Sequence, residues 1–556
     1  MKKIFTTIML ALSLNYGMAQ AFWTPTTYKG AFDCTQPMWT NTWTEWDPQN
    51  HVYPAPTVTI TSNITSNTLW TSGNVYLLQG QIYVKAGATL TIQPGTIIQG
   101  SKAVAGSGLF ICTGSQLIAN GTVNQPIVFT SDQPAGSRTT GDWGGVILMG
   151  LAATNNTMGI NNIEGIAPSP DTQYGGGGTP NPNDNSGSLK YVRIEYPGFV
   201  YAPNKEINGL TFGSVGAGTT IDYIQVSFSN DDSFEWFGGN VNCKHLVAYR
   251  GLDDDFDTDN GYSGYVQFIL GVRDPAIADN PAVSTSEGFE SDNDPTGSSL
   301  TPLTDAVFSN ATMIGPYRGN SAQPLASGYR RGARIRRNSE LDIHNSIFMD
   351  YKGGTAGGVM IDGTACENNA TALTLNFMHN LNVWTTGVTP KTCETVSLST
   401  FPITTWYALS GNDSTHTTST GTPFLVQPYN YTSPDYRPAC SNTAATSGAS
   451  FSNTAFVAGG ILGVNDIDRS ITSSGLYPNP TANTTELFIN AELSFPINVQ
   501  IYSVTGQLVS APYVQYTIVA GPNNLPLNTT SLSSGIYFVK MQYGTKNETI
   551  KLVVNK

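Results

Sequence analysis

Two stretches of the chain that lie 22 residues apart repeat the same order of residue types. Setting "DDSFEWFGG" (231–239) above "DDDFDTDNG" (253–261) pairs like with like: Asp231 with Asp253, Asp232 with Asp254, Phe234 with Phe256, Glu235 with Asp257, and Gly239 with Gly261. A third copy, "FESDND" (289–294), follows the second after 33 residues and adds Phe289, Glu290 and Asp292. Repeats of this length are typical of solenoids, in which each repeat buries its apolar face against the next one.

Short strand-like segments recur along most of the chain. In 75–100 and 109–130 they alternate apolar with polar residues and are separated by Gly, Pro-Gly or Asn-Gly, and similar segments return as "LKYVRIEY", "IDYIQVSF", "KHLVAY" and "LDIHNSIFM". No segment has a 3.6-residue period with caps, so we expect no long helices. The pattern predicts an all-β chain with a right-handed parallel β-helix over 57–440. A β-sandwich or a β-propeller is the alternative.

The repeat predicts which side chains stack in such a coil. Equivalent residues of successive coils would lie about 4.8 Å apart. Phe234, Phe256 and Phe289 would form an inward aromatic ladder. Because side chains alternate along a strand, the next residues would face outward as a ladder of carboxylates, namely Glu235, Asp257 and Glu290.

Carboxylates stacked this closely repel each other unless solvent or a cation compensates. Calcium accepts six to eight oxygen ligands, so we consider a calcium site on the acidic residues of the repeats: Asp231, Asp253, Asp255, Asp257, Asp259 and Asp292. The segment is not an EF-hand, because its glycine comes one position late, at Gly261, and position twelve would be Val266. Solvated acidic turns without an ion are the alternative.

An enzymatic interpretation uses the same residues. Carboxylates about 5 Å apart suit a retaining glycosidase, with Glu235, Asp257 and Glu290 as candidates. In "YRRGARIRRN" (329–338), Arg334 and Arg336 would share one face of a strand. With calcium on the acidic columns, an arginine could act as the base on a uronic-acid sugar, as in polysaccharide lyases of this fold class. This hypothesis requires the arginines to lie beside the carboxylates; otherwise they merely neutralise nearby acids.

The start of the chain carries an export signal. Lys2 and Lys3 precede a short apolar run and small residues, which predicts a signal peptide over 1–21. No later run is long enough to span a membrane, and the formal net charge of −13 disfavours nucleic acid as a partner. Residues 22–56, rich in tryptophan, are expected to cap the open end of the coil. The chain has six cysteines, for which 15 disulfide connectivities are open, and Cys366 with Cys393 closes the shortest loop.

The C-terminal part differs in composition from the body. A Ser/Thr/Ala/Gly-rich linker (441–474) leads to amphipathic strands over 475–556, which predict a small immunoglobulin-like β-sandwich. The "YPNP" start, the "IYSVTGQLV" hairpin, the "SSGIYFVKM" strand and the lysine at the end resemble the type A sorting domain of the type IX secretion system. The resemblance implies a Bacteroidetes-type bacterium, contact with the type IX secretion machinery, and release from or attachment to the cell surface.

The body is similar to a set of proteins secreted by the same bacteria, through "LTIQPGTIIQG", "GDWGGVILMG" and "DDSFEWFGG" among others. This resemblance implies the fold and export but assigns no catalytic residue. "CTQP" after "YKGAF" departs from the usual pattern and implies an additional disulfide through Cys34.

These observations predict an exported β-helix protein, secreted or on the outer cell surface. Its expected role is adhesion, glycan binding or structure, with a polysaccharide or a host or cell-surface glycan as the ligand and Ca²⁺ as the only cofactor. The alternative is a calcium-dependent polysaccharide lyase or a glycoside hydrolase acting on an acidic polysaccharide.

Overall fold

The computed structural model describes residues 22–202, 205–282, 284–317, 325–353, 356–385, 393–396, 398–418, 424–451, 471–491, 495–519, 521–543 and 546–556. These residues form two compact units, one over 25–450 and one over 451–556 that also includes the described residues up to Thr24. The signal peptide expected over 1–21 and the middle of the linker expected over 441–474 lie outside the described residues.

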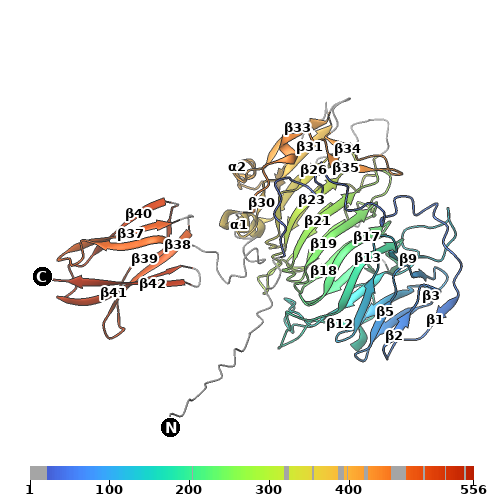
Figure 1. Ribbon diagram of the computed structural model, residues 1–556, viewed down its shortest axis with the longest axis horizontal. Coiled ribbons are helices and arrows are strands. Elements are labelled where there is room, and N and C mark those ends of the chain that lie inside the picture. Colours follow the sequence, from blue (N-terminus) through green and yellow to red (C-terminus); the bar gives the residue numbers. More distant parts are fainter. Residues whose placement is uncertain are drawn as a thin grey trace, which may run out of the picture. The chain divides into compact units, whose positions relative to one another are not determined.

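The unit over 25–450 is a parallel β-helix, as the repeats predict (Figure 1). One sheet stacks ten parallel strands, in the order β4 (Gln81–Val84), β7 (Gly108–Ile111), β10 (Val146–Met149), β16 (Leu210–Gly213), β18 (Phe234–Phe237), β20 (Phe256–Asp259), β22 (Phe289–Ser291), β24 (Ala333–Arg336), β29 (Val359–Asp362) and β32 (Cys393–Thr395). Because parallel strands in a coil pair with the next coil, each strand covers the edges of its neighbours.

The second sheet has seventeen strands, and along the sequence these strands alternate, singly or in small groups, with the strands of the first sheet. They are β1 (Val58–Ile60), β2 (Thr68–Trp70), β3 (Val75–Leu78), β5 (Thr89–Ile92), β6 (Ile97–Gly100), β8 (Gln116–Asn120), β9 (Ile127–Ser131), β13 (Gly187–Glu195), β17 (Thr220–Ser227), β19 (Cys243–Tyr249), β21 (Tyr265–Val272), β23 (Val307–Ile314), β25 (Asp342–His344), β26 (Ile347–Met349), β30 (Phe377–Met378), β31 (Leu381–Thr385) and β33 (Asp413–Thr418). In the described part of this unit, three short α-helices, α1 (Thr364–Ala372), α2 (Ile403–Leu409) and α3 (Thr443–Thr446), lie towards the C-terminal end, and one 3₁₀ turn spans Pro170–Thr172.

Small antiparallel pairs extend from the loops of the β-helix. They are β11 (Asn161–Asn162) with β12 (Gln173–Tyr174), β14 (Val200–Ala202) with β15 (Lys205–Glu206), β27 (Lys352–Gly353) with β28 (Ala356–Gly357), and β34 (Leu425–Gln427) with β35 (Asp435–Pro438). The first two pairs belong to the loops nearest the site described below.

The predicted register is confirmed. In β18, β20 and β22, Phe234 pairs with Phe256 and Phe256 pairs with Phe289. Successive rings are 5.4 Å apart between centroids, and all three are fully buried. One residue later, Glu235 pairs with Asp257 and Asp257 with Glu290. The carboxylate ladder therefore exists, on the side of the strands that faces away from the core.

The sequence predicts a cap over 22–56 at the open end of the coil; in the structure, residues 25–56 lie instead across strands of the seventeen-stranded sheet. Ala31 N donates a hydrogen bond of 2.9 Å to Thr312 of β23, the Trp39 ring packs on His245 of β19, and the Trp43 ring packs on Tyr191 of β13. Aromatic rings that protrude from these strands pack against the tryptophans of this segment. We call the segment 25–56 the strap.

A disulfide between Cys34 and Cys440 fastens the strap, which confirms the additional bridge expected through Cys34. Cys366 is a buried thiol in α1, so the short loop between Cys366 and Cys393 is not closed by a disulfide.

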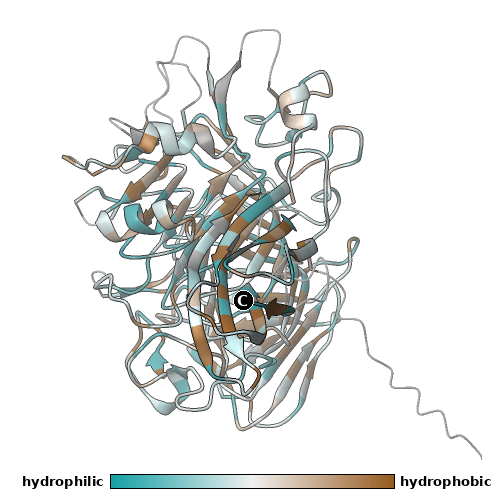
Figure 2. Cartoon of the chain, turned by 90° about the vertical axis from the view of Figure 1, so that its left-hand side faces the viewer, coloured by the Kyte–Doolittle hydropathy of each residue, from teal (hydrophilic) through white to brown (hydrophobic). Residues whose placement is uncertain are grey.

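The C-terminal unit consists of two antiparallel sheets. One contains β36 (Ile471–Tyr477), β37 (Thr484–Ala491) and β40 (Gly521–Asn528); the other contains β38 (Phe495–Ser503), β39 (Leu508–Ile518), β41 (Gly535–Tyr543) and β42 (Lys546–Val554). Hydrophobic and hydrophilic residues alternate along these strands (Figure 2), and alternate residues of β37 are buried. Leu487 and Ile489 of the first sheet share one core with Val499 and Val539 of the second.

Candidate functional site

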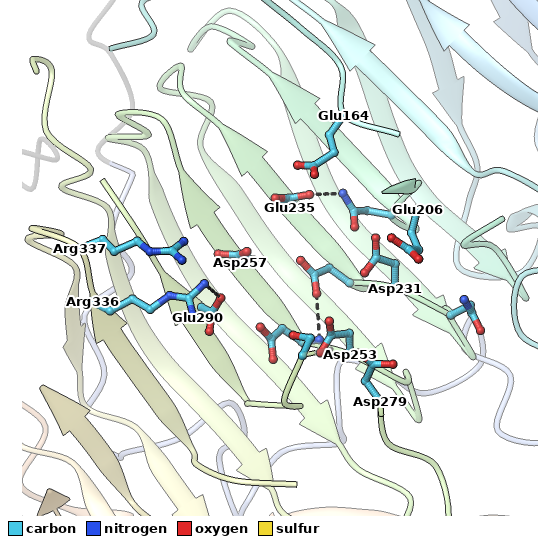
Figure 3. A pocket seen from close by; sticks show the side chains of 15 residues that line it. Glu164, Glu206, Asp231, Glu235, Asp253, Asp257, Asp279, Glu290, Arg336 and Arg337 are labelled. Atoms are coloured by element: carbon cyan, nitrogen blue, oxygen red, sulfur yellow. Dashed lines mark hydrogen bonds and ion pairs between the residues drawn. The ribbon is translucent and has the colours of Figure 1, made fainter. Parts of the chain in front are cut away.

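The carboxylate ladder lines a cavity of about 590 Å³ in the β-helix (Figure 3). Ten of its fifteen lining residues are acidic: Glu164, Glu206, Asp231, Asp232, Glu235, Asp253, Asp254, Asp257, Asp279 and Glu290. Arg336 and Arg337 are the basic residues of the lining, and Figure 3 shows both entering from one side of the space that the carboxylates surround. We call this space the acidic cavity.

The coil repeat places most of these acids. Glu235, Asp257 and Glu290 lie on neighbouring strands because β18, β20 and β22 pair in register. In the turns before the strands, Asp232 accepts a hydrogen bond of 2.8 Å from the backbone N–H of Asp254, and Asp254 in turn accepts one from the N–H of Glu287. The turn aspartates thus use one oxygen to join successive coils and leave the other for the cavity.

Three groups of carboxylates could each hold a cation. They are Asp231, Asp232 and Asp253; Asp232, Glu235 and Asp257; and Asp254, Asp257 and Glu290, and within each group one oxygen per residue lies within 4.8 Å of the others. Asp232 and Asp257 each belong to two groups, so the three groups form one connected row.

The acidic cavity also contains buried oxygen atoms without partners. Asn208 is only 4% exposed; its Nδ2 donates to Glu235, but its Oδ1 has no hydrogen-bond partner in the part of the chain that the structure describes. The same holds there for Asp253 Oδ1 and Asp257 Oδ1. Leaving buried acceptors unsatisfied costs free energy, and carboxylate and amide oxygens are the ligands that calcium prefers. The residues therefore fit a bound calcium ion.

Burial and mutual repulsion shift the ionisation of these acids. Burial, reinforced by neighbouring carboxylates, raises the pKa of Asp231 to about 8 and the pKa values of Glu235, Asp257 and Glu290 well above their ordinary value. A cation would compensate the same charge that protons otherwise compensate, so protons and a bound cation would compete for these carboxylates.

Arginines border the row at its Glu290 end. Arg336 forms ion pairs with Glu290 and, at 2.7 Å, with Asp292, and Arg334 lies 3.7 Å from Glu290. The arginines are thus close enough for the enzymatic hypothesis. Burial alone would lower the pKa of Arg336, but the carboxylates of Glu290 and Asp292 outweigh burial and raise it. They keep the guanidinium protonated, which suits a charged contact and disfavours a basic role.

The structure separates the other predicted residues from the cavity lining. Asp255 is fully buried outside the cavity lining and pairs at 3.1 Å with the equally buried Arg273, so it is not available as a ligand of the cavity. Asp259 pairs in register with Phe237 and lies outside the cavity, and Asp292 is engaged by Arg336 and Arg337. Arg334 is held at 2.7 Å by Asp362.

Five acids of the lining were not among the predicted site residues. Asp232 and Asp254 follow from the same repeat and could have been included. Glu164, Glu206 and Asp279 come from loops that lie outside the repeats, and no sequence signal placed them near the ladder.

Comparisons with known proteins agree with this architecture. A family model described as a pectate-lyase-like β-helix domain matches residues 62–423, and one described as a secretion system C-terminal sorting domain matches residues 475–555. No curated protein matches the chain. In the described residues, no helix is both long and apolar enough to cross a membrane.

Two solved structures are distantly similar. The enzymatically active domain of bacteriophage CBA120 tailspike protein 2 is 13% identical, with 87% of this chain and 72% of that chain covered and a TM-score of 0.20. The full-length tailspike protein 2 from Escherichia coli O157:H7 bacteriophage CAB120 is 10% identical, with 87% and 65% covered and a TM-score of 0.14. Similarity this low carries no functional conclusion.

Proposed function

The chain belongs to the pectate-lyase-like β-helix family and carries a C-terminal secretion sorting domain, so it is a protein secreted or displayed on the outer cell surface, and we propose that it binds an acidic polysaccharide there through calcium held in the acidic cavity. The proposal concerns binding, in an adhesive or structural role. The antiparallel C-terminal unit, in the form of a small sandwich, would serve export alone.

The observation that carries the proposal is the charge of the acidic cavity. Its ten carboxylates face two guanidinium groups, and an anionic ligand would be repelled unless a cation intervened. With one ligand oxygen from each residue, a group of three carboxylates supplies three of the six to eight oxygens that calcium takes. A calcium ion there would keep coordination positions for the carboxylate and hydroxyl oxygens of a sugar.

The arginine end of the cavity supports a second contact to such a ligand. Arg337 is 43% exposed and pairs with Asp292 at 2.6 Å, so its guanidinium remains accessible beside the row. Guanidinium groups recognise carboxylates well because of their planar, forked donors. A uronate-containing chain would therefore meet calcium in the row and positive charge at its edge.

The test is binding of defined oligouronates to the mature, full chain, measured by calorimetry with free calcium held at fixed levels. We expect calcium alone to bind, and oligouronates to bind only when calcium is present; magnesium should substitute poorly because it demands a tighter octahedral geometry. Binding that persists unchanged in chelator would refute the role of calcium. Neutral oligosaccharides of equal length are the control for charge.

Cleavage is the second candidate, favoured by the contact of Arg336 with Glu290 and by the raised pKa of Glu235. The same mixtures are therefore assayed for new reducing ends and for unsaturated uronate. Because Arg336 stays protonated, we expect binding without either product. Calcium-dependent release of unsaturated ends would instead identify a lyase, and saturated reducing ends a hydrolase.

A further inference from the structure

A second cavity, of about 630 Å³, borders the same turns as the acidic cavity. Leu252 lines the second cavity and the next residue, Asp253, lines the acidic one. Likewise, in the loop after β21, Ala278 lines the second cavity and the next residue, Asp279, lines the acidic cavity. A single line of turn residues therefore separates the two spaces.

The wall between the cavities is held by polar contacts. Thr140, which lines the second cavity, donates a hydrogen bond of 3.2 Å to Asn230, which lines the acidic cavity. Two successive turns, at Leu252–Asp253 and at Ala278–Asp279, thus border both spaces, which places the two cavities side by side.

The second cavity has the mixed chemistry of a sugar site. Leu252 and Ile277 offer apolar contacts, while Gln49 and Asn50 of the strap offer hydrogen-bonding groups. Its volume lies within the range of small-molecule sites. A pyranose ring has an apolar face and a rim of hydroxyls, and this lining matches both.

The second cavity also differs from the acidic cavity in charge. Arg138 donates hydrogen bonds to the backbone carbonyls of Pro48, His51 and Gln133, and these neutral acceptors do not cancel its positive charge. Arg250 is fixed by Asp274 at 2.9 Å and stacks 4.8 Å from the centre of the Phe228 ring. The two guanidinium groups are balanced by Asp47 of the lining and by Asp274, so the second cavity lacks the excess negative charge of the acidic cavity and does not repel a ligand that carries carboxylates.

We infer that the second cavity is a further subsite for a uronate-containing chain, and that one such chain occupies both cavities at once. This inference rests on the proposed function, because it assumes that the acidic cavity holds calcium and neighbouring units of the same polymer. The strap then has a binding role in addition to its packing role, since it supplies one wall of the subsite.

The inference is tested with oligouronates of increasing length on the full chain in saturating calcium. We expect the affinity to rise with length until a chain spans both cavities and to level off beyond that length. Ala276→Trp, which fills the second cavity, should weaken the long oligomers at least tenfold and leave calcium and the shortest bound oligomer unchanged. Ala278→Trp is a second variant with the same expectation.

Ala282→Trp is the matched control, because Ala282 is an exposed alanine of the same loop that lines neither cavity. Unaltered unfolding curves of the three variants establish that they fold. If short oligomers bind but length and Ala276→Trp have no effect, the further subsite is refuted and the acidic cavity stands. If no oligouronate binds in calcium at any length, the proposed function itself fails.

Discussion

Replacing Asp257 by asparagine should stabilise the calcium-free protein and, at the same time, weaken its response to calcium. Asp257 belongs to two of the three carboxylate groups, and its pKa is raised by burial and then by Asp254 and Asp292. Asparagine keeps the size and one oxygen of the side chain but removes the charge. A residue with a purely structural role would change the free energy of unfolding by the same amount with and without calcium.

The magnitude follows from the spacing of the oxygens. Two ionised carboxylates whose oxygens lie within 4.8 Å repel by about 3 kcal/mol at an effective dielectric constant of 20. Protonation relieves part of this repulsion at neutral pH, so we expect Asp257→Asn to raise the free energy of unfolding by about 1–2 kcal/mol without calcium. At a calcium concentration 100 times the dissociation constant, the wild type should gain about 2.7 kcal/mol, and a variant that binds tenfold more weakly only about 1.4 kcal/mol.

The assay is urea denaturation of the mature chain at pH 7.5, followed by tryptophan fluorescence, in chelator and at fixed free calcium. Asp305→Asn is the matched control: the carboxyl of Asp305 also has a pKa raised, to about 7, by burial and by Asp342 and Glu340, but it belongs to none of the carboxylate groups of the acidic cavity. It should alter stability equally in both conditions. Destabilisation of calcium-free protein by Asp257→Asn, or an undiminished calcium response, would refute the reasoning.

Three further predictions concern pH, the arginines and the strap. In chelator, the free energy of unfolding should fall as the pH rises from 5 to 8, because carboxyls such as Asp231, with a folded pKa of about 8, hold protons that the unfolded chain has released. Each such proton contributes a slope of about −1.4 kcal/mol per pH unit. Urea denaturation curves that do not move with pH would contradict this. Arg336→Gln should destabilise the calcium-free protein by about 1–3 kcal/mol, and more at pH 8 than at pH 5, because it removes the nearest cation from Glu290 and one of the two cations from Asp292. An equal loss at both pH values would show that packing of the side chain dominates. Cys34→Ser together with Cys440→Ser should make residues 25–56 sensitive to limited proteolysis while the coils resist, as mapped by mass spectrometry, and unchanged cleavage would show that packing of the tryptophans alone holds the strap.

The stacking of Phe234, Phe256 and Phe289 could be predicted because it depends only on the repeat and on the alternation of side chains in a strand. The position of the strap could not. Its tryptophans pack against rings such as Tyr191, Tyr223 and His245, whose φ angles are 50°, 59° and 53°. A residue in the left-handed region interrupts the alternation, so a pattern of period two does not reveal which way these rings point.

The candidate site was predictable to the same extent as the repeat. Asp257 and its neighbours follow from the register. Asp255, which directly precedes the inward Phe256, lies outside the cavity lining because it forms an interior ion pair with Arg273. Glu164, Glu206 and Asp279 lie in loops whose paths depend on packing against several coils at once. Seven of the ten acids that line the cavity were therefore visible in the repeat, and the other three required coordinates.

In a parallel in-register coil, a repeated acid is a cost to the fold, because stacking brings identical charges to neighbouring strands. Nothing in the geometry of β18, β20 and β22 requires an acid at these positions, since the Cα partners of Glu235 on the preceding strand and of Glu290 on the following one are Thr211 and Arg334. Uncharged residues there would form the same ladder with less repulsion. Extracellular calcium-binding modules commonly have dissociation constants of about 10⁻⁴–10⁻³ M, and a protein delivered outside the cell can rely on a cation of that affinity to offset the repulsion. The row of acids thus lowers the stability of the calcium-free coil, and bound calcium would offset the repulsion. A site for a cation-bridged ligand requires this dependence on the cation.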